Sequence, residues 1–365
     1  MTAAKSTRIN RRGAALERLV LIAGLLLAGR AEAAEPRMVA VPGEAITALR
    51  LVDVPQRTVL LGRDGVLHDS MRESWRQRGG RQLREVEGPF QPFSPLEFRG
   101  RLQEEFGVGY EVVATQHYLV VQPRGRGRRW PACFERMYRQ FVSYMERRGV
   151  VTRQGRFPLV AVIYPDEASM RVAIEKLGLQ MGRVAGLYDL ASNRVLLHDQ
   201  LRAEETAATV RHEAAHQTAY NVGVHSRVSP TPRWLLEGVG SLFEPASMEQ
   251  VRRGTLADRV PAGRLDEVAS LDQDALAAEV RQLVTGDVHF QDPDRVRTAY
   301  AVSWAMTFFL AERQPARFAA YLRQTQQLPP FEAYPGGRRV ADFERLLDTD
   351  IARFAHRLER FLAAL

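Results

Sequence analysis

One stretch of this 365-residue chain restricts the surrounding structure more than any other. Residues 206–221 contain neither glycine nor proline and are rich in alanine, so we expect them to form a helix. Within this stretch the sequence at 212–216 reads His-Glu-Ala-Ala-His. Residues four apart lie on one face of a helix, so both imidazoles can point to the same place.

Two imidazoles at this spacing are typical of a zinc site, with Zn–N distances of about 2.0–2.1 Å. Glu213 directly follows the first histidine and is placed to remove a proton from a water molecule on the metal. Zinc lowers the pKa of such a water towards about 7, and a carboxylate can then complete the deprotonation. We therefore expect one Zn²⁺ per chain, with His212 and His216 as ligands and Glu213 as the catalytic carboxylate.

A catalytic zinc site needs a third protein ligand, and spacing separates the candidates. In the metzincin class of zinc peptidases the motif continues with a glycine and a histidine at the positions that Ala219 and Val222 occupy here. The metzincin class is therefore excluded. His225 lies just beyond the expected helix end near Gly223, which is a poor position for a ligand. Glu237 is better placed.

Glu237 belongs to a segment, 232–244, that reads as a second short helix. Thr231 is a plausible N-cap, and Pro232 suits the first helical position. An apolar face would pack this helix against its neighbours and so carry Glu237 to the metal. The residues of that face are Trp234, Leu235, Val239 and Leu242.

The segments at 212–216 and 234–238, with twenty residues between His216 and Glu237, resemble the gluzincin superfamily. This superfamily includes thermolysin-like enzymes and the single-zinc aminopeptidases. Within it, the chain is similar to a poorly characterised bacterial family of exported gluzincin-like proteins, known mainly as a domain of unknown function. The similar parts fall within about 105–310 and are 109–113, 115–118, 186–188, the zinc motif and 234–244.

The resemblance implies a zinc peptidase in which His212, His216 and Glu237 are the ligands and Glu213 is the catalytic carboxylate. It also points to Glu244, two helical turns after Glu237, as a carboxylate that orients a ligand imidazole. The alternative is that Glu244 is a solvent-facing charge at a helix end.

Related enzymes stabilise the oxyanion with a Tyr or His from a later helix, which makes Tyr300 a catalytic candidate. Alternatively, Tyr300 is packed in the core with its hydroxyl satisfied. An extended peptide commonly pairs with the edge strand before the zinc helix, and 194–197 is the expected equivalent. The chain lacks the Gly-x-Met-Glu-Asn motif with which the aminopeptidases bind a free N-terminus. We therefore expect an endopeptidase acting on peptides or proteins.

Residues 1–33 show the parts of a secretory signal: a basic start, an apolar run at 19–28, and small residues at Ala31 and Ala33. We expect cleavage after Ala33 and export to the periplasm or out of the cell. An apolar run of about ten residues is shorter than the roughly twenty needed to span a bilayer, so no stable membrane insertion is expected.

The formal net charge of +8 includes +4 from six basic and two acidic residues in 1–33. The rest of the chain therefore carries a net charge of only +4. This charge is weak support for nucleic-acid binding, which usually shows as a concentrated basic face, so no nucleic-acid partner is expected. Cys133 is the only cysteine and allows no internal disulfide. Its apolar surroundings in sequence predict a buried thiol.

We expect an α+β fold with a thermolysin-like zinc domain in its middle. After the signal peptide, the divisions are a β-rich region at 34–125, the zinc-binding catalytic subdomain at 126–260 and a helical subdomain at 261–365. Expected strands are 58–61, 110–115, 117–122, 158–164 and a hairpin over 188–198. Further expected helices are 131–147, 166–177, 271–284, 295–311, 315–324 and 341–365.

Two other functions fit the same motif. One is a noncatalytic zinc-binding, gluzincin-like module of the cell envelope, and the other is a zinc amidase acting on cell-wall material. Glu213 beside the first ligand argues against a purely structural site, which usually closes with a fourth protein ligand. An open zinc site with a carboxylate base would serve the peptidase and the amidase equally well.

Overall fold

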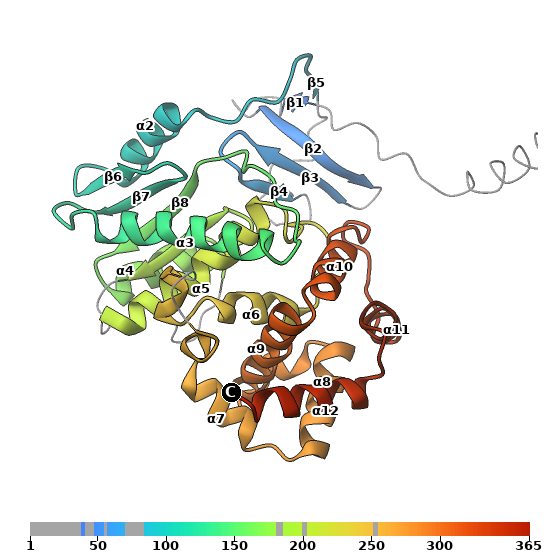
Figure 1. Ribbon diagram of the computed structural model, residues 1–365. Coiled ribbons are helices and arrows are strands. Elements are labelled where there is room, and N and C mark those ends of the chain that lie inside the picture. Colours follow the sequence, from blue (N-terminus) through green and yellow to red (C-terminus); the bar gives the residue numbers. More distant parts are fainter. Residues whose placement is uncertain are drawn as a thin grey trace, which may run out of the picture. The chain divides into compact units, whose positions relative to one another are not determined.

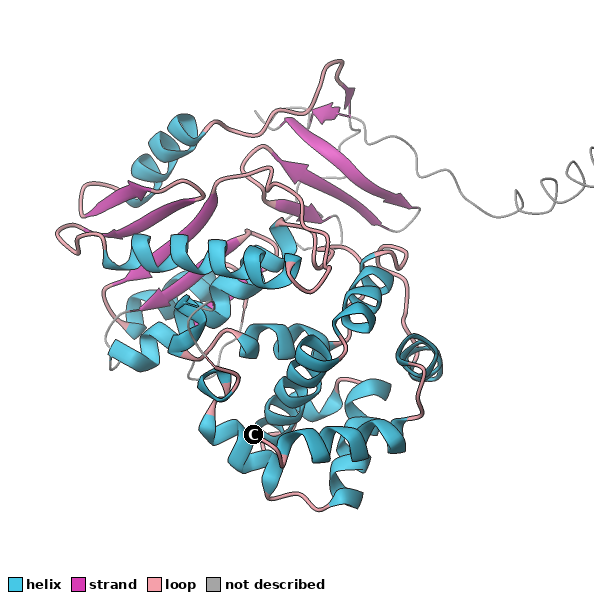
Figure 2. Ribbon diagram, viewed as in Figure 1, coloured by secondary structure: helices cyan, strands magenta, loops and turns pink. Residues whose placement is uncertain are grey.

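The computed structural model describes residues 38–40, 47–54, 57–69, 84–179, 185–198, 203–250 and 255–365. The expected signal segment at 1–33 lies outside the described residues. Met38–Leu365 form one compact unit, whose described residues include ten strands in two sheets (Figures 1 and 2). The strands are β1 (Met38–Ala40), β2 (Thr47–Val54), β3 (Arg57–Gly62), β4 (Leu67–Asp69), β5 (Arg84–Glu85), β6 (Tyr110–Ala114), β7 (Tyr118–Pro123), β8 (Leu159–Tyr164), β9 (Gly186–Asp189) and β10 (Arg194–His198).

The helices before residue 251 surround the second sheet or follow it, and those after residue 255 form a helical C-terminal part. They are α2 (Pro95–Phe106), α3 (Arg129–Glu146), α4 (Glu167–Lys176), α5 (Ala203–Asn221), α6 (Arg233–Leu242), α7 (Ala262–Ala269), α8 (Gln273–Thr285), α9 (Val296–Arg313), α10 (Pro315–Gln326), α11 (Gly336–Leu347) and α12 (Ile351–Leu362). Short 3₁₀ turns are η1 (Ala246–Gln250), η2 (Ala257–Arg259) and η3 (Val288–Phe290).

The first sheet is an antiparallel arrangement in the order β4-β3-β2-β1-β5. Its apolar residues form a small core of their own, which Phe157 and Phe331 from later in the chain join. The backbone of Leu67 donates a hydrogen bond of 2.8 Å to the carbonyl of Ala191, just after β9. The N-terminal sheet therefore contacts the turn of the β9–β10 hairpin.

The second sheet is mixed, in the order β6-β7-β8-β10-β9. Its three central strands, β7, β8 and β10, run parallel, and both outer strands are antiparallel to their neighbours. Every residue of β8 is buried, as expected of a parallel strand covered on both faces. β6 and β7 precede residue 125, so this sheet continues across the boundary expected there.

Two helices cover each face of the second sheet, which makes three layers (Figure 1). On one face, α3 and α5 pack on Val120, Ile163 and Leu197 in the main hydrophobic core. On the other face, α2 and α4 pack on side chains of alternate residues such as Val121 and Val162. This alternation follows from the two-residue period of a strand.

The helical C-terminal part is built around α9, whose residues 301–311 are all buried. A helix that is apolar on all sides belongs inside a core, and α6, α7, α8, α10 and α12 all contact it. Gly238 of α6 permits the closest approach. A Cβ atom added there would stand 2.0 Å from the hydroxyl oxygen of Thr307 and 2.5 Å from the carbonyl oxygen of Ser303.

We expect Gly238→Ala to destabilise the fold by about 1–3 kcal/mol, because the added methyl group overpacks a tight helix contact. Thermal or denaturant unfolding would measure the loss. Gly263→Ala in α7 is the control, because nothing lies within 4 Å of its added Cβ. Alanine there should leave stability unchanged or raise it by up to about 1 kcal/mol. Equal stability of the two variants would contradict the close packing of α6 on α9.

The predicted α+β class, the N-terminal sheet and the helical C-terminal part are confirmed. Two expectations need correction. The expected helix at 341–365 is two helices, because Asp348 adopts a left-handed conformation (φ 50°) and ends α11. Helix α2 was not expected, although Ser94 and Glu97 form a capping box around Pro95 at its start. Among the described residues, no helix has both the length and the apolar character to cross a bilayer.

Candidate metal centre

Helix α5 presents His212 and His216 on one face, one turn apart. The residue after His216 fixes the helix against the sheet. Gln217 is fully buried, and its amide donates to the carbonyls of Val160 (3.0 Å) and Asn193 (2.7 Å). These bonds connect α5 to β8 and to the hairpin turn, so the position of the two imidazoles is set by the central sheet.

Helix α6 presents Glu237, and its N-terminus is held by the C-terminal part of the chain. The expected Thr231 cap is wrong, because the structure gives Thr231 Oγ1 no hydrogen-bond partner. Instead, Asp287 accepts the backbone N–H of Arg233 at 3.1 Å. Asp287 is itself held by both terminal nitrogens of Arg339, at 2.8 and 2.9 Å. A carboxylate at a helix N-terminus satisfies a free N–H and complements the helix dipole.

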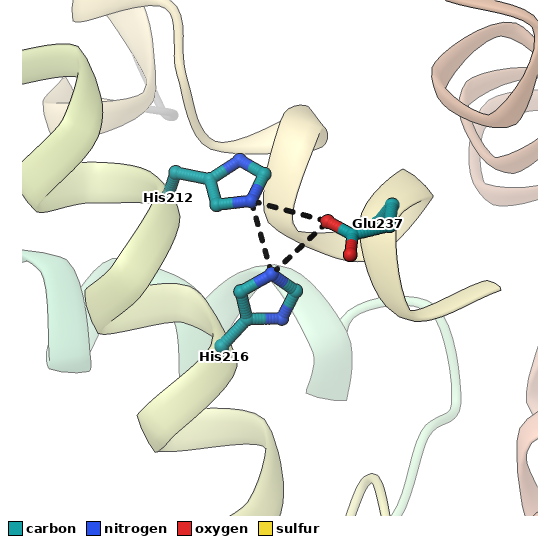
Figure 3. A group of neighbouring side chains, drawn as sticks. All are labelled: His212, His216 and Glu237. Carbon is teal, nitrogen blue, oxygen red and sulfur yellow. Dashed lines mark hydrogen bonds and ion pairs between the residues drawn. The ribbon is translucent and has the colours of Figure 1, made fainter. Parts of the chain in front are cut away.

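The three side chains converge, as Figure 3 shows. The Nε2 atoms of His212 and His216 lie 3.0 Å apart, and Glu237 Oε2 lies 3.5 and 3.6 Å from them. Two ligands of one tetrahedral zinc, each about 2.0–2.1 Å from it, are about 3.3–3.4 Å apart. The donor set therefore fits zinc in both chemistry and spacing. Within the described part of the chain, no other group of three His, Cys, Asp or Glu residues meets this spacing.

Negative charge surrounds His212. Its Nδ1 lies 2.9 Å from Glu244 Oε1, and burial, which disfavours protonation, is outweighed by Glu237 and Glu244, so that the pKa of His212 rises to about 10. Burial also opposes ionisation of Glu244, yet His212 and Arg264 lower its pKa to about 2. The structure thus places Glu244 where it can orient the His212 ring. Such an environment favours a cation between the ligands.

Arginines hold the two carboxylates from outside. Arg264 forms two hydrogen bonds to Glu244, one of them 2.9 Å long. Arg233 Nε lies 3.3 Å from Glu237 Oε1, the oxygen turned away from the imidazoles. Arg233 thus leaves Oε2 of Glu237 to the imidazoles, whereas Arg264 bonds both oxygens of Glu244, including the Oε1 that faces His212.

Gly240 lies against both imidazoles. A Cβ atom added to it would stand 2.8 Å from the Nε2 atoms of both His212 and His216. The backbone of α6 therefore forms one wall of the site, one turn after Glu237. Only a residue without a side chain leaves the ligand atoms where they are.

Glu213 faces strand β9. Its Oε2 accepts the backbone N–H of Tyr188 at 2.7 Å. A cavity of about 240 Å³ is lined by Gly186 and Thr209 as well as by His212, Glu213 and Glu244. The carboxylate is thus fixed between the first ligand and an open space large enough for part of a substrate.

The expected edge strand at 194–197 is wrong. β10 is an inner strand, paired with β8 on one side and β9 on the other, and the edge is β9. Residues 195–198 of β10 are all buried, as expected of a strand inside a sheet that is covered on both faces. The strand open to an added peptide is therefore Gly186–Asp189.

Tyr300 lies beside the site, with its ring centre 6.5 Å from that of His212. Burial and the charge of Glu237 raise its pKa, so the hydroxyl keeps its proton at neutral pH. His225 is not part of the metal group, which consists of His212, His216 and Glu237. It is 1% exposed, and burial lowers its pKa to about 3.

Replacing Glu244 with alanine should weaken zinc binding about 10- to 100-fold, because the His212 ring loses the acceptor that orients it. Competition with a chromogenic chelator would measure the dissociation constant. Glu104→Ala, at an exposed position of α2, is the control and should leave it unchanged. A zinc affinity unaffected by Glu244→Ala would assign this carboxylate to Arg264 alone.

Sequence reasoning missed several residues of this site: Tyr188, Arg233, Gly240, Arg264 and Asp287. Glycines within the second helix of the motif, 233–242, were a readable sign of close approach. The sequence around Asp287 and Arg264 gave no indication of a role in the site, because these residues reach it only when helices distant in sequence pack together.

In comparisons with known proteins, part of the chain matches the model of one protein family. No curated protein matches the chain. Residues 206–332 match a family described as "Protein of unknown function (DUF1570)". The matched segment contains all three residues of the metal group together with Glu213, Glu244 and Tyr300. In this segment, which includes the three converging side chains but only about a third of the chain, the protein is similar to that family of unknown function.

Proposed function

We propose that this protein is a zinc-dependent peptidase, and specifically an endopeptidase. The observation that carries the proposal is the convergence of His212, His216 and Glu237 at zinc spacing, with Glu213 fixed directly beside them. Among the described residues the group has three possible protein ligands and no fourth, which is typical of catalytic zinc, whereas structural zinc is closed by four.

Bound zinc would act as a Lewis acid and make a water molecule acidic enough to lose its proton near neutral pH. Glu213 accepts that proton as the water attacks the peptide carbonyl carbon, and later delivers it to the leaving amine. The N–H of Tyr188 keeps the Glu213 carboxylate aimed at the site. The neutral hydroxyl of Tyr300 donates a hydrogen bond to the developing oxyanion.

An extended peptide would bind by pairing with β9. This edge strand precedes α5, and the Tyr188 N–H that holds Glu213 lies on it. Pairing through the backbone tolerates many side chains, which suits a peptidase acting within varied sequences. Because Glu213 occupies the Tyr188 N–H, the other backbone groups of β9 that point away from β10 would form these bonds.

A gluzincin-like arrangement and an exported location belong to the same proposal. The mixed sheet with its antiparallel edge strand, the helix with two histidines and the following helix with Glu237 support the first. The basic, apolar and small-residue pattern of 1–33 supports the second.

Metal analysis combined with hydrolysis assays tests this function. Purified full-length protein should contain about one zinc per chain and should cleave casein and unstructured peptides, with peptidoglycan tested in parallel. Cleavage of peptidoglycan alone would assign the site to a cell-wall amidase. Zinc without hydrolysis of any of these substrates would favour a noncatalytic binding module, and a folded chain that takes up no zinc would overturn the assignment.

A further inference from the structure

A second and larger cavity, of about 500 Å³, lies at the C-terminal end of α5. Its walls come from the N-terminal sheet, from residues 153–157, from the end of α5 and the loop after it, and from the end of α10. A cavity of this size accommodates several residues of a peptide or a small organic molecule. Neither the metal group nor Glu213 lines it.

Arg227 is fixed in the wall of this cavity, and no carboxylate of the described residues forms an ion pair with it. Its guanidinium donates to the backbone carbonyls of Gly65 (2.7 Å), Leu190 (3.1 Å) and Ala191 (3.1 Å). Burial lowers its pKa, and the charges of Asp189 and Asp64 oppose this effect only in part. A partly buried cation held by neutral carbonyls leaves a positive field that an anion would neutralise.

Two further arginines, both exposed, line the same cavity: Arg153 and Arg156. The guanidinium of Arg153 lies against Gly223, where an added Cβ would stand 2.6 Å from Arg153 Nε. In the part of the chain that the structure describes, neither arginine forms an ion pair, and no Asp or Glu lines the cavity.

His225 also lines the cavity. It is 1% exposed, and among the described residues neither of its ring nitrogens has a hydrogen-bond partner. Because both nitrogens are buried, the ring serves here as part of the cavity wall, and the arginines carry the recognition of an anion.

The cavity also has an apolar side, formed by Leu51, Leu61, Leu67 and Phe157. A free inorganic anion would make no favourable contact with these apolar side chains. An organic molecule with an anionic group would contact the arginines with its charge and the apolar side chains with its carbon skeleton.

Tyr220 connects this cavity to the metal centre. It follows His216 by one helical turn on the same face of α5, and it lines the cavity. Its ring contacts that of Tyr188, at 5.7 Å between centres, and that of His225, at 5.5 Å. From His216 to Asn221, which ends α5 and lines the cavity, the helix rises about 7.5 Å, roughly the length of two extended residues.

We propose that this cavity is a specificity pocket that binds a carboxylate of the substrate peptide, a few residues from the bond that is cleaved. The inference rests on the proposed peptidase function and deepens it. The carboxylate comes either from an Asp or Glu side chain or from the peptide's C-terminus, because both present the same two oxygens to Arg153, Arg156 and Arg227.

Matched peptides separate the two sources. A parent peptide that the full-length protein cleaves is made without acidic residues and with an amidated C-terminus. One series places Glu or Gln at each of four positions on either side of the cleaved bond. A second series compares the free C-terminal acid with the amide. We expect a carboxylate in one register to raise kcat/KM about tenfold, which corresponds to about 1.4 kcal/mol and one charge-assisted hydrogen bond.

The double variant Arg153→Gln/Arg156→Gln should reduce this preference to within about twofold while leaving the parent peptide's kcat unchanged. Its control, Arg99→Gln/Arg171→Gln, removes the same charge from exposed positions on α2 and α4 that do not line the cavity, and should keep the preference. A preference that is absent in every register, or that survives in Arg153→Gln/Arg156→Gln, overturns the inference and leaves the peptidase proposal intact.

Binding measurements keep the two proposals distinguishable if no peptide is cleaved. Fluorescence anisotropy with labelled Glu, Gln, acid and amide peptides reports binding without turnover. Tighter binding of the carboxylate forms, lost in Arg153→Gln/Arg156→Gln, would support the pocket although the peptidase proposal had failed. Equal binding of all forms would overturn the pocket as well.

Discussion

Replacing Glu213 with glutamine is expected to lower kcat by about 10²- to 10⁴-fold, the usual contribution of a general base. Glutamine has the same shape, and its side-chain oxygen can still accept the N–H of Tyr188. It has no basic oxygen, so the attacking water keeps its proton. Initial rates with casein or a cleaved peptide would measure the loss, and metal analysis would show whether zinc is still bound.

Zinc content and melting temperature should be unchanged in Glu213→Gln, since Glu213 is not one of the three converging ligands. Glu175→Gln, at an exposed position of α4, is the matched control for the amide substitution and should retain full activity. Activity within a few-fold of the unsubstituted protein would exclude Glu213 as the base. Loss of zinc together with activity would instead make it part of the metal site.

Removing zinc with a chelator is expected to abolish hydrolysis and to lower the stability of the fold. A ligand that binds only the folded state at 1,000 times its dissociation constant stabilises it by about 4 kcal/mol. The metal would bridge the two imidazole Nε2 atoms, which lie 3.0 Å apart, and Glu237, and so would tie α5 to α6. The melting temperature should therefore decrease by several degrees, as calorimetry would show.

One equivalent of Zn²⁺ should restore both the activity and the melting temperature. Mg²⁺ is the control and should restore neither, because it prefers oxygen ligands to two imidazoles. If chelation verified by metal analysis changes neither quantity, the three residues do not hold a functional metal.

The sequence predicted the metal group more fully than the surrounding structure. A spacing of four residues is close to one helical turn, so it places His212 and His216 on the same face whatever the rest of the fold. The local sequence pattern was therefore sufficient to predict this pair. Glu237 required only a second short helix with one apolar face, and α6 has that face buried. Periodicity also located α3, α4, β8 and the β9–β10 hairpin.

Long-range contacts were beyond such reasoning. Either strand of the β9–β10 hairpin fits the edge of a sheet by pattern, and only the parallel pairing of β10 with β8 decides between them. Thr231 has the right chemistry for an N-cap, but Asp287, more than fifty residues later, takes that role. Gaps of this length in sequence carry no local signal.

The close contact of α6 with α9 also sets an order of events during folding. Gly238 packs on Ser303 and Thr307, so the support for Glu237 lies far downstream of it in the chain. During synthesis from the N-terminus, the two histidines are complete long before that support exists. In the proposed zinc protein, high metal affinity would therefore arise only after the chain has passed Arg313 and α9 has docked, and metal binding would be a late step of folding.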